Sequence, residues 1–305
     1  MSDSPLPQDL GRISGTDFRQ ILRSFNEQLV VHETDINTLN VFPVPDADTG
    51  TNSLVTVQAA IMGLSAEPIA DDSLRQVVKQ FAHFAALNAR GNSGSILAEY
   101  FRGLAEALQD SAGVQQWSAA LQSAADCAHQ AVLSPREGTM LSVATAVAHT
   151  PEQYSLAEYL GDVTHVAKSA LLETTHQLDE LREADVVDAG ACVLVLFHAA
   201  VSSFFNNHVI NIAFLQENAC ITVARLYSGP EFEVTYLLTT GQDIRGALQS
   251  QLSELGDSIT IAGTIPVFTV HIHTDEVQSV IDVGHSLGEV SMVTTTALSE
   301  FITQQ

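Results

Sequence analysis

Two carboxylates separated by one residue stand in a proline-stiffened loop, and this spacing could hold a divalent cation. Asp46 and Asp48 follow Pro43 and Pro45 in the stretch Asn-Val-Phe-Pro-Val-Pro-Asp-Ala-Asp-Thr-Gly-Thr-Asn, residues 40–52. Mg²⁺ prefers oxygen ligands and is usually held by one or two carboxylates, while the phosphates of a nucleotide fill other positions. The apolar residues that follow predict a helix, and the backbone N–H groups at a helix N-terminus suit phosphate. The pattern therefore predicts a magnesium–nucleotide site.

Two other interpretations of this loop stay open from the residues alone. Asp, Gly, Thr and Asn are common in turns and at helix N-caps, and most Asp-x-Asp loops bind nothing. The oxygen-bearing side chains at positions 46, 48 and 52 are also compatible with a calcium loop. An EF-hand loop needs glycine at its sixth position and glutamate at its twelfth, where this chain has Thr51 and Val57, so calcium is the weaker alternative.

The charge balance of the chain limits its partners. The 305 residues carry 36 Asp and Glu against 12 Lys and Arg, which gives a net charge of −24. Such a chain repels nucleic acid and anionic lipid at long range, so we expect neither a nucleic-acid partner nor membrane insertion. A bound nucleotide would take most of its countercharge from the cation, helped by arginines such as Arg90 and Arg136.

Targeting signals and cysteine usage favour a cytoplasmic protein. The first residues lack the basic and apolar regions of a signal peptide. The longest apolar run, residues 193–201, is interrupted by His198 and is too short to span a bilayer. Cys127, Cys192 and Cys220 are odd in number and scattered, which favours reduced core thiols over a disulfide or zinc framework.

Up to residue 206 the apolar residues recur with helical spacing, and this periodicity predicts helices throughout. We therefore expect an all-α bundle over residues 1–206, with its ligand-binding loops gathered at one end. The eight predicted segments are 16–34, 51–64, 73–88, 93–108, 117–133, 139–150, 155–183 and 190–205.

After residue 206 the pattern changes to strands that alternate with short helices. The order ββαββαβ predicts a small α+β sheet domain within residues 207–305. Open sheet edges tend to pair or to be covered, so we expect a homodimer formed through this domain. The predicted strands are 219–227, 231–240, 258–262, 267–273 and 289–294, and the predicted helices are 243–255 and 276–287.

Three further loops of the helical region combine glycine with small polar residues at a predicted helix start. They span residues 89–95, 137–140 and 185–190. Each offers backbone N–H donors and little side-chain bulk where a nucleotide needs close approach. Singly, each could be an ordinary capped turn. Four such loops in one bundle favour a shared site, because connections between bundled helices need not be glycine-rich.

The four loops also resemble a known family. The stretch 40–52, Ala-Arg-Gly-Asn-Ser-Gly at 89–94, Pro-Arg-Glu-Gly-Thr at 135–139 and Val-Val-Asp-Ala-Gly at 186–190 follow the order and spacing of the DhaL-type nucleotide-binding domain. Residues 219–295, notably Val-His-Ile-His-Thr-Asp at 270–275, are similar to the middle domain of its bacterial fatty acid kinase A-subunit branch. The resemblance covers nearly the whole chain. It implies a barrel of eight antiparallel helices that binds ATP or ADP with Mg²⁺ at one end.

The resemblance also implies an activity and a partner. In that branch the kinase phosphorylates the carboxylate of a fatty acid, which a separate DegV-like fatty-acid-binding protein presents. An acyl carboxylate is already a nucleophile at neutral pH, so catalysis would need positioning and screening of the γ-phosphoryl charge. The dihydroxyacetone kinase branch has histidine after its second metal-binding aspartate, whereas this chain has Thr49, which disfavours a small triose substrate.

Carried over residue by residue, the resemblance assigns roles within the loops. Asp46 and Asp48 would be Mg²⁺ ligands, with Asn40 as a third. Arg90 would be the cationic helper in phosphoryl transfer, although from a turn it could equally serve a structural carboxylate. The residues expected to contact the nucleotide are Thr49, Gly50, Thr51, Asn52, Ser53, Asn92, Ser93, Gly94, Gly138, Thr139, Met140, Asp188 and Gly190.

Three departures from the family pattern bear on function. Residues 191–193, Ala-Cys-Val, replace further small residues and could reshape the base end of the nucleotide site. The family's middle domain has a cysteine that forms a zinc site with two histidines, whereas 234–236 is Val-Thr-Tyr. With no third soft ligand, we expect His271 and His273 to be satisfied surface or interface residues rather than zinc ligands. Longer members add a C-terminal domain thought to meet the acyl carrier, and this sequence ends at Gln305.

These observations leave three functions open. The first is an ATP-dependent kinase that acts on a carrier-bound fatty acid. The second is a nucleotide-binding regulatory subunit without turnover, which the three departures favour. The third is a phosphotransferase subunit of the dihydroxyacetone kinase type, which Thr49 disfavours.

Overall fold

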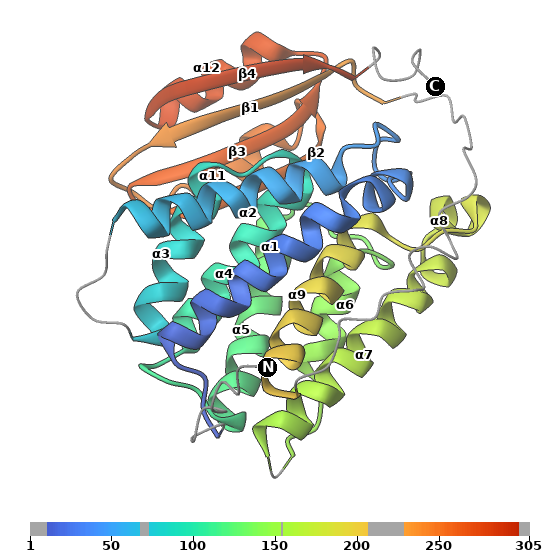
Figure 1. The fold of residues 1–305 in the computed structure, drawn as a ribbon. Helices are drawn as coiled ribbons and strands as arrows, with labels where there is room; N and C mark the ends of the chain where they lie inside the picture. Colours follow the sequence, from blue (N-terminus) through green and yellow to red (C-terminus); the bar gives the residue numbers. More distant parts are fainter. Residues whose placement is uncertain (1–10, 68–72, 154, 207–228, 299–305) are drawn as a thin grey trace.

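The computed structural model describes residues 11–67, 73–153, 155–206 and 229–298. They form a helical domain followed by a small antiparallel sheet domain, which confirms the predicted fold class (Figure 1). The sheet domain packs against three consecutive helices of the helical domain. These are α3 (Leu74–Leu87), α4 (Gly91–Ala107) and α5 (Val114–Ala131).

The helical segments agree with the sequence pattern except at one predicted helix, 155–183. This segment breaks at Leu178, whose backbone is extended (φ −117°, ψ 128°) and whose side chain is buried. Gly138 lies so close that a Cβ placed on it would be 2.9 Å from Cβ of Leu178. Packing of the 137–140 loop against Leu178 therefore coincides with the break. The remaining helices are α1 (Gly15–Thr38), α2 (Thr49–Ala66), α6 (Met140–Ala148), α7 (Leu156–Gln177), α8 (Asp179–Ala184) and α9 (Ala189–Asn206).

Helix α9 lies in the centre of the helical domain, between α1, α6 and α7. The whole helix is longer than the apolar run 193–201, and its 18 residues, with a mean hydropathy of 1.6, could cross a bilayer by length and composition alone. However, 83% of this window is buried inside the protein. A helix that is apolar all round is typical of a domain core, and the ring of Phe197 stacks edge-on with Phe101 at 4.9 Å.

The sheet has the strand order β2-β3-β1-β4, and all neighbours are antiparallel. Two helices cover one face, over a core that includes Tyr236, Phe268 and Ile272. The predicted first strand, 219–227, lies outside the described residues, and the other predicted strands and helices of this domain are confirmed. Their bounds are β1 (Phe232–Thr239), α11 (Arg245–Leu252), β2 (Asp257–Thr264), β3 (Val267–Thr274), α12 (Val277–Leu287) and β4 (Glu289–Ala297).

The second face of the sheet is turned toward the helical domain. Oγ1 of Thr269 donates a 2.5 Å hydrogen bond to the carbonyl of Ala86 at the end of α3. Thr260 forms an isolated β-bridge with Val132, and Ala262 joins the helical core. The alternation of a strand places His271 and His273 on this same face as Thr269. The sheet domain therefore forms part of the surroundings of the helical loops.

Candidate functional site

Asp46 and Asp48 are brought together by a left-handed turn at Ala47 (φ 55°), which lies between them. Their carboxyls are within hydrogen-bonding reach of each other. Burial first, and then the charge of Asp48, raise the pKa of Asp46 to about 9, and burial also raises the pKa of Asp48. Two crowded carboxylates disfavour the ionised state unless a cation balances them. This pair therefore has the chemistry of a divalent-cation site.

Asn40 supports this pair through its side-chain amide. Its Nδ2 donates to Oδ1 of Asp46 at 2.6 Å and to the carbonyl of Val44 at 2.7 Å. Its Oδ1 accepts a hydrogen bond from the hydroxyl of Thr49. Asn40 thus orients Asp46, and its role as a third metal ligand stays a prediction. Asn52 supports the second carboxylate in the same way, since its Nδ2 donates to Oδ2 of Asp48 at 2.7 Å.

The N-terminus of α2 is less available to phosphate than the sequence suggested. Oδ1 of Asn37, in α1, accepts the backbone N–H of Gly50 at 2.7 Å and that of Thr51 at 3.1 Å. The hydroxyl of Thr51 donates to Oε1 of Glu33 at 2.7 Å. A Cβ on Gly50 would lie 2.4 Å from the carbonyl oxygen of Glu33. Gly50 and Thr51 therefore join α2 to α1, and the expectation that their N–H groups are free is wrong.

Residues from all four predicted loops line a single pocket. Thr49, Asn92, Ser93, Thr139, Met140, Asp188 and Gly190 were all expected there, and Ser258 and Thr260 of β2 complete the wall. Oδ1 of Asn92 is buried and has no hydrogen-bond partner among the described residues. The four loops therefore share one pocket, and the contribution of β2 to its wall is one that the sequence did not reveal.

Other expected residues lie around this pocket rather than on its wall. A Cβ on Gly91 (φ +57°) would meet Nδ2 of Asn52 at 2.7 Å, and one on Gly94 would meet Oγ1 of Thr56 at 2.5 Å. These glycines let α4 begin close against α2. Oγ of Ser53 is fully buried and has no partner in the described part of the chain.

Asp188 lines the pocket and caps α9. Its Oδ1 accepts the N–H of Ala191 at 2.6 Å, and its own N–H donates to Oγ1 of Thr174 at 3.0 Å. Burial raises the pKa of Asp188 to about 7. The backbone N–H groups of Ala191 and Met140 both act against this rise, so the carboxyl of Asp188 is bound to the starts of α9 and α6.

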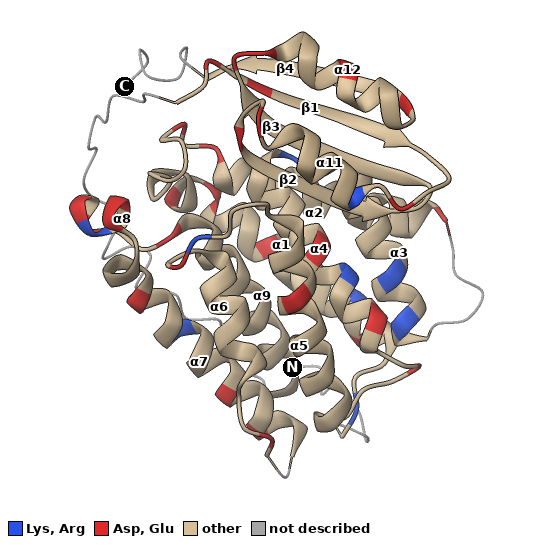
Figure 2. Ribbon diagram, turned by 180° about the vertical axis from the view of Figure 1, so that it is seen from behind, with Lys and Arg blue, Asp and Glu red and all other residues tan. Residues whose placement is uncertain are grey.

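The sheet domain adds a carboxylate to this acidic region. Glu233 of β1 contributes to the raised pKa values of Asp46 and Asp48, while Arg90 at the start of α4 lowers the pKa of Glu233 against the effect of burial. The exposed guanidinium of Arg90 therefore has an acidic neighbour from the second domain. Acidic residues are spread over most elements, and basic residues are few (Figure 2).

His271 and His273 are buried, not surface residues, at the contact between the domains. Their Nε2 atoms are 3.2 Å apart, and ligand atoms of both lie within 4.8 Å of a Glu233 oxygen. Burial lowers the pKa of His271 to about 4 and that of His273 to about 3, so both are neutral at pH 7, the form that binds metals. No soft third ligand was visible in the sequence, but two histidines and a carboxylate also fit zinc.

The sequence comparisons agree with this arrangement. Residues 43–203 match the DAK2 domain, and residues 229–304 match the middle domain of proteins like the A-subunit of fatty acid kinase. Protein YloV of Bacillus subtilis is 27% identical over 301 residues, which cover 91% of this chain and 54% of the relative. An uncharacterised protein of Staphylococcus saprophyticus is 26% identical over 302 residues, with 92% and 54% covered.

The chain spans about half the length of the curated relatives it matches. The first matched region runs from the loop before α2 into α9, and the second includes the strands and helices of the sheet domain. Because the first match covers more than half of the residues, the chain belongs to the DAK2 domain family, with a middle domain of the fatty acid kinase type after it.

Proposed function

We propose that this chain is the ATP-dependent component of a kinase that phosphorylates a fatty acid carboxylate presented by a DegV-like carrier protein. Membership in a kinase-related family supports the phosphotransfer chemistry. The single observation that carries the proposal is the pocket, because loops far apart in the sequence meet in its wall, and one of them contributes Thr49, which directly follows the Asp46–Asp48 pair in the chain.

Different residues of the site would bind the metal ion and the nucleotide. Asp46 and Asp48 would hold Mg²⁺, which supplies countercharge to the phosphates when it is bound. Asn92 and Ser93 at the start of α4, with Thr139 at the start of α6, face the nucleotide pocket. The acceptor needs no side-chain base, since a carboxylate is already ionised at neutral pH. The protein's contribution is then binding, orientation and charge.

Thermal denaturation with ADP and Mg²⁺ tests the first half of the proposal. We expect the melting temperature to rise with ligand concentration, because a ligand that binds only the folded state stabilises it. The double variant Asp46→Ala/Asp48→Ala should remove the magnesium dependence of this shift. No shift with millimolar ADP and Mg²⁺ in the unmodified protein would rule out nucleotide binding.

A nucleotide-binding protein without turnover is the second candidate. It is favoured by the hydrogen bonds that already occupy the N–H groups of Gly50 and Thr51, and by the closeness of Glu233 to Arg90. Both reduce the positive charge left for a transferring phosphoryl group. Formation of acyl phosphate with a DegV-like carrier from the same genome would exclude this candidate, whereas nucleotide binding without any acyl phosphate would support it.

We also propose that the sheet domain forms a homodimer through β4. This strand is at the edge of the sheet and is exposed along most of its length, with Met292 75% exposed and Val293 42% exposed. Exposed edge strands of this kind tend to pair with another strand. Sedimentation at micromolar concentration should give a dimer, and a monomer would contradict the proposal.

A further inference from the structure

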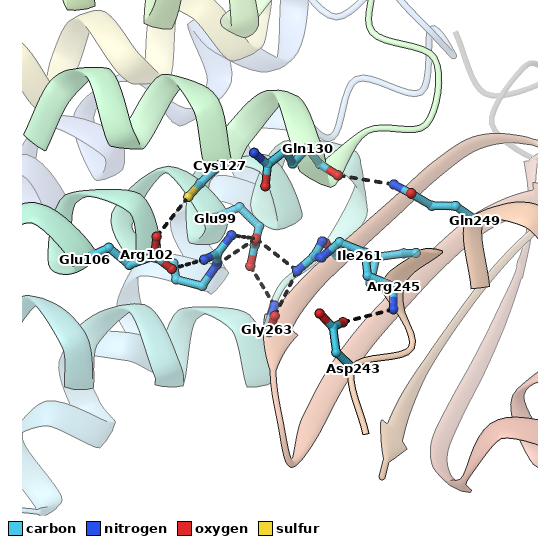
Figure 3. A network of polar contacts seen from close by, with 10 residues as sticks. All are labelled: Glu99, Arg102, Glu106, Cys127, Gln130, Asp243, Arg245, Gln249, Ile261 and Gly263. Carbon is cyan, nitrogen blue, oxygen red and sulfur yellow. Dashed lines mark hydrogen bonds and ion pairs between the residues drawn. The ribbon is translucent and has the colours of Figure 1, made fainter. Parts of the chain in front are cut away.

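A buried carboxylate joins the two domains at a point outside the nucleotide pocket. Glu99 of α4 is completely buried, and its Oε1 accepts the N–H of Gly263 in β2 at 2.7 Å (Figure 3). Its Oε2 accepts from Nη2 of Arg245 in α11 at 3.2 Å. We call Glu99, Arg245 and Gly263 the interdomain latch. On its own helix, Glu99 also pairs with Arg102 at 2.8 Å.

Arg245 fixes the end of β2 within this latch. Its Nη2 donates to the carbonyl of Gly263 at 2.9 Å, and its Nη1 donates to that of Ile261. Gly263 has φ +97°, and a Cβ on it would lie 2.6 Å from the carbonyl oxygen of Val267. The turn between β2 and β3 therefore requires glycine, and its N–H is presented to Glu99. Charge-assisted hydrogen bonds in a water-poor setting are stronger than ordinary ones.

The latch and the nucleotide pocket are built from the same two elements. Helix α4 carries Asn92, Ser93 and Ile96 in the pocket wall, and Glu99 follows Ile96 by about one helical turn. Strand β2 carries Ser258 and Thr260 in the same wall, and Gly263 lies further along it. A shift of β2 along α4 would therefore change both places together.

We propose that Glu99 is a positioning residue: by fixing β2 against α4, it holds Ser258 and Thr260 in the wall of the nucleotide pocket. The affinity for nucleotide then depends on a contact that the nucleotide does not touch. This inference rests on the proposed nucleotide binding, and it assigns the sheet domain a direct part in forming the site. Removing Glu99 leaves Arg245 and the N–H of Gly263 without their acidic partner, and removing Arg245 takes the only charged partner of the latch away from the sheet side of Glu99, so either change weakens the contact between the domains.

Calorimetric titration with ADP and Mg²⁺ tests the inference. We expect Glu99→Gln and Arg245→Gln each to raise the dissociation constant about tenfold, in the range usual for coupled sites. The double variant should bind no more weakly than the weaker single variant, because both remove the same contact. Glu106→Gln is the matched control, since this 53% exposed carboxylate pairs with Arg102 on α4 and accepts from Cys127 on α5, both in the helical domain. Its affinity should equal that of the unmodified protein.

Hydrogen exchange at the amide of Gly263 supplies a second readout that a purely structural role would not change. By reciprocity, bound ADP and Mg²⁺ should slow this exchange in the unmodified protein and much less in Glu99→Gln. If Glu99→Gln does not fold, Arg245→Gln carries the same test. Unchanged affinity in a folded variant, or exchange that ignores the nucleotide, would overturn the inference while leaving nucleotide binding intact. Failure of the unmodified protein to bind would overturn both.

Discussion

Oε1 of Glu233 on β1 lies 3.8 Å from Nδ1 of His271 on the neighbouring strand β3. The charge of this carboxylate helps to raise the pKa of Asp46, and Arg90 in turn lowers the pKa of Glu233. Glu233 therefore stands between a buried histidine pair in one domain and the acidic loop of the other. The charge of Glu233 therefore acts electrostatically on both the histidine pair and the Asp46–Asp48 loop, although no ligand bridges them.

Glu233, as a third ligand beside His271 and His273, should complete a metal site. We expect the purified protein to bind about one zinc ion per chain, because three ligand side chains suffice when water fills the fourth position. Glu233→Ala should weaken zinc binding by more than the roughly 10–100-fold that loss of an outer-shell partner costs. Competition with a chromophoric chelator measures the affinity. Glu231→Gln, which changes an exposed carboxylate just before the same strand, is the control. Equal affinity of the two variants would contradict the assignment.

The acidic loop should cost stability when no cation is bound. The pKa of Asp46 is raised from 3.8 to about 9, so the folded state disfavours the charge that the unfolded state carries at neutral pH. The contribution of Asp46 to stability should therefore fall as pH rises from about 4 toward 9 in the absence of divalent cations. Asp46→Asn keeps an oxygen that can accept from Asn40 and removes the charge. We expect it to stabilise the ligand-free protein by about 2 kcal/mol at pH 7, as measured by urea denaturation.

The same variant should bind ADP and Mg²⁺ poorly, since it lacks one of the two carboxylates. Asp46→Asn should therefore be more stable than the unmodified protein but bind the ligand less well, because binding the cation requires two like charges close together. Asp185→Asn gives a control with a carboxylate in an exposed position. If Asp46→Asn destabilises the ligand-free protein, the crowding argument is wrong.

The elements and most of the pocket could be predicted from the sequence, because their signals are local. Helical periodicity and the glycine-bearing loops each depend on neighbouring residues, and seven predicted residues line the pocket. The misses are contacts between segments that are far apart. Asn37 reaches α2 from α1, and Glu233 meets His273 only because β1 and β3 pair in one particular register.

Glu233 and Gly50 show why contacts between distant segments could not be predicted from the sequence. A lone glutamate on a strand looks like a solvated residue, and the register that buries it follows from hydrophobic packing on the other face of the sheet. Likewise Gly50 looks like a phosphate-binding glycine, although its lack of a Cβ is needed for contact with α1. At both positions the residue type indicated a special role, but the spacing of residues along the chain could not identify the partner segment.

Two glycine substitutions separate packing from helix propensity. Gly50→Ala should destabilise the protein by about 1–3 kcal/mol, because the new Cβ would lie 2.4 Å from the backbone oxygen of Glu33. Gly161→Ala, within α7, meets nothing closer than Nδ2 of Asn206 at 4.0 Å. It should stabilise by roughly 0.5–1 kcal/mol, the difference in helix propensity. Urea denaturation followed by circular dichroism measures both. A neutral Gly50→Ala would mean that α1 and α2 are not in tight contact.

The buried His198 should make stability depend on pH on the acid side. Burial lowers its pKa from 6.5 to about 3, and its Nε2 lies 3.1 Å from the hydroxyl of Tyr100. The folded state keeps it neutral, while the unfolded state takes up a proton below pH 6.5. Its contribution is therefore complete above pH 6.5 and is lost as pH falls toward 3, by about 1.4 kcal/mol per pH unit. His271 and His273 act in the same direction, whereas the raised pKa of Asp46 acts in the opposite one. The contribution of His198 is therefore measured as the difference in slope between a variant and the unmodified protein.

Between pH 4 and 6, His198→Leu should reduce the slope of the unfolding free energy against pH by about 1.4 kcal/mol per pH unit, which corresponds to one proton. His176→Leu changes an exposed histidine of α7 and should leave the slope unchanged. Denaturant titrations at half-unit pH intervals measure both slopes. The two substitutions each introduce leucine, so a difference between them reports burial of the imidazole rather than the added apolar surface. Identical slopes would show that His198 is protonated in the folded protein, and that the centre of the helical domain admits a charge.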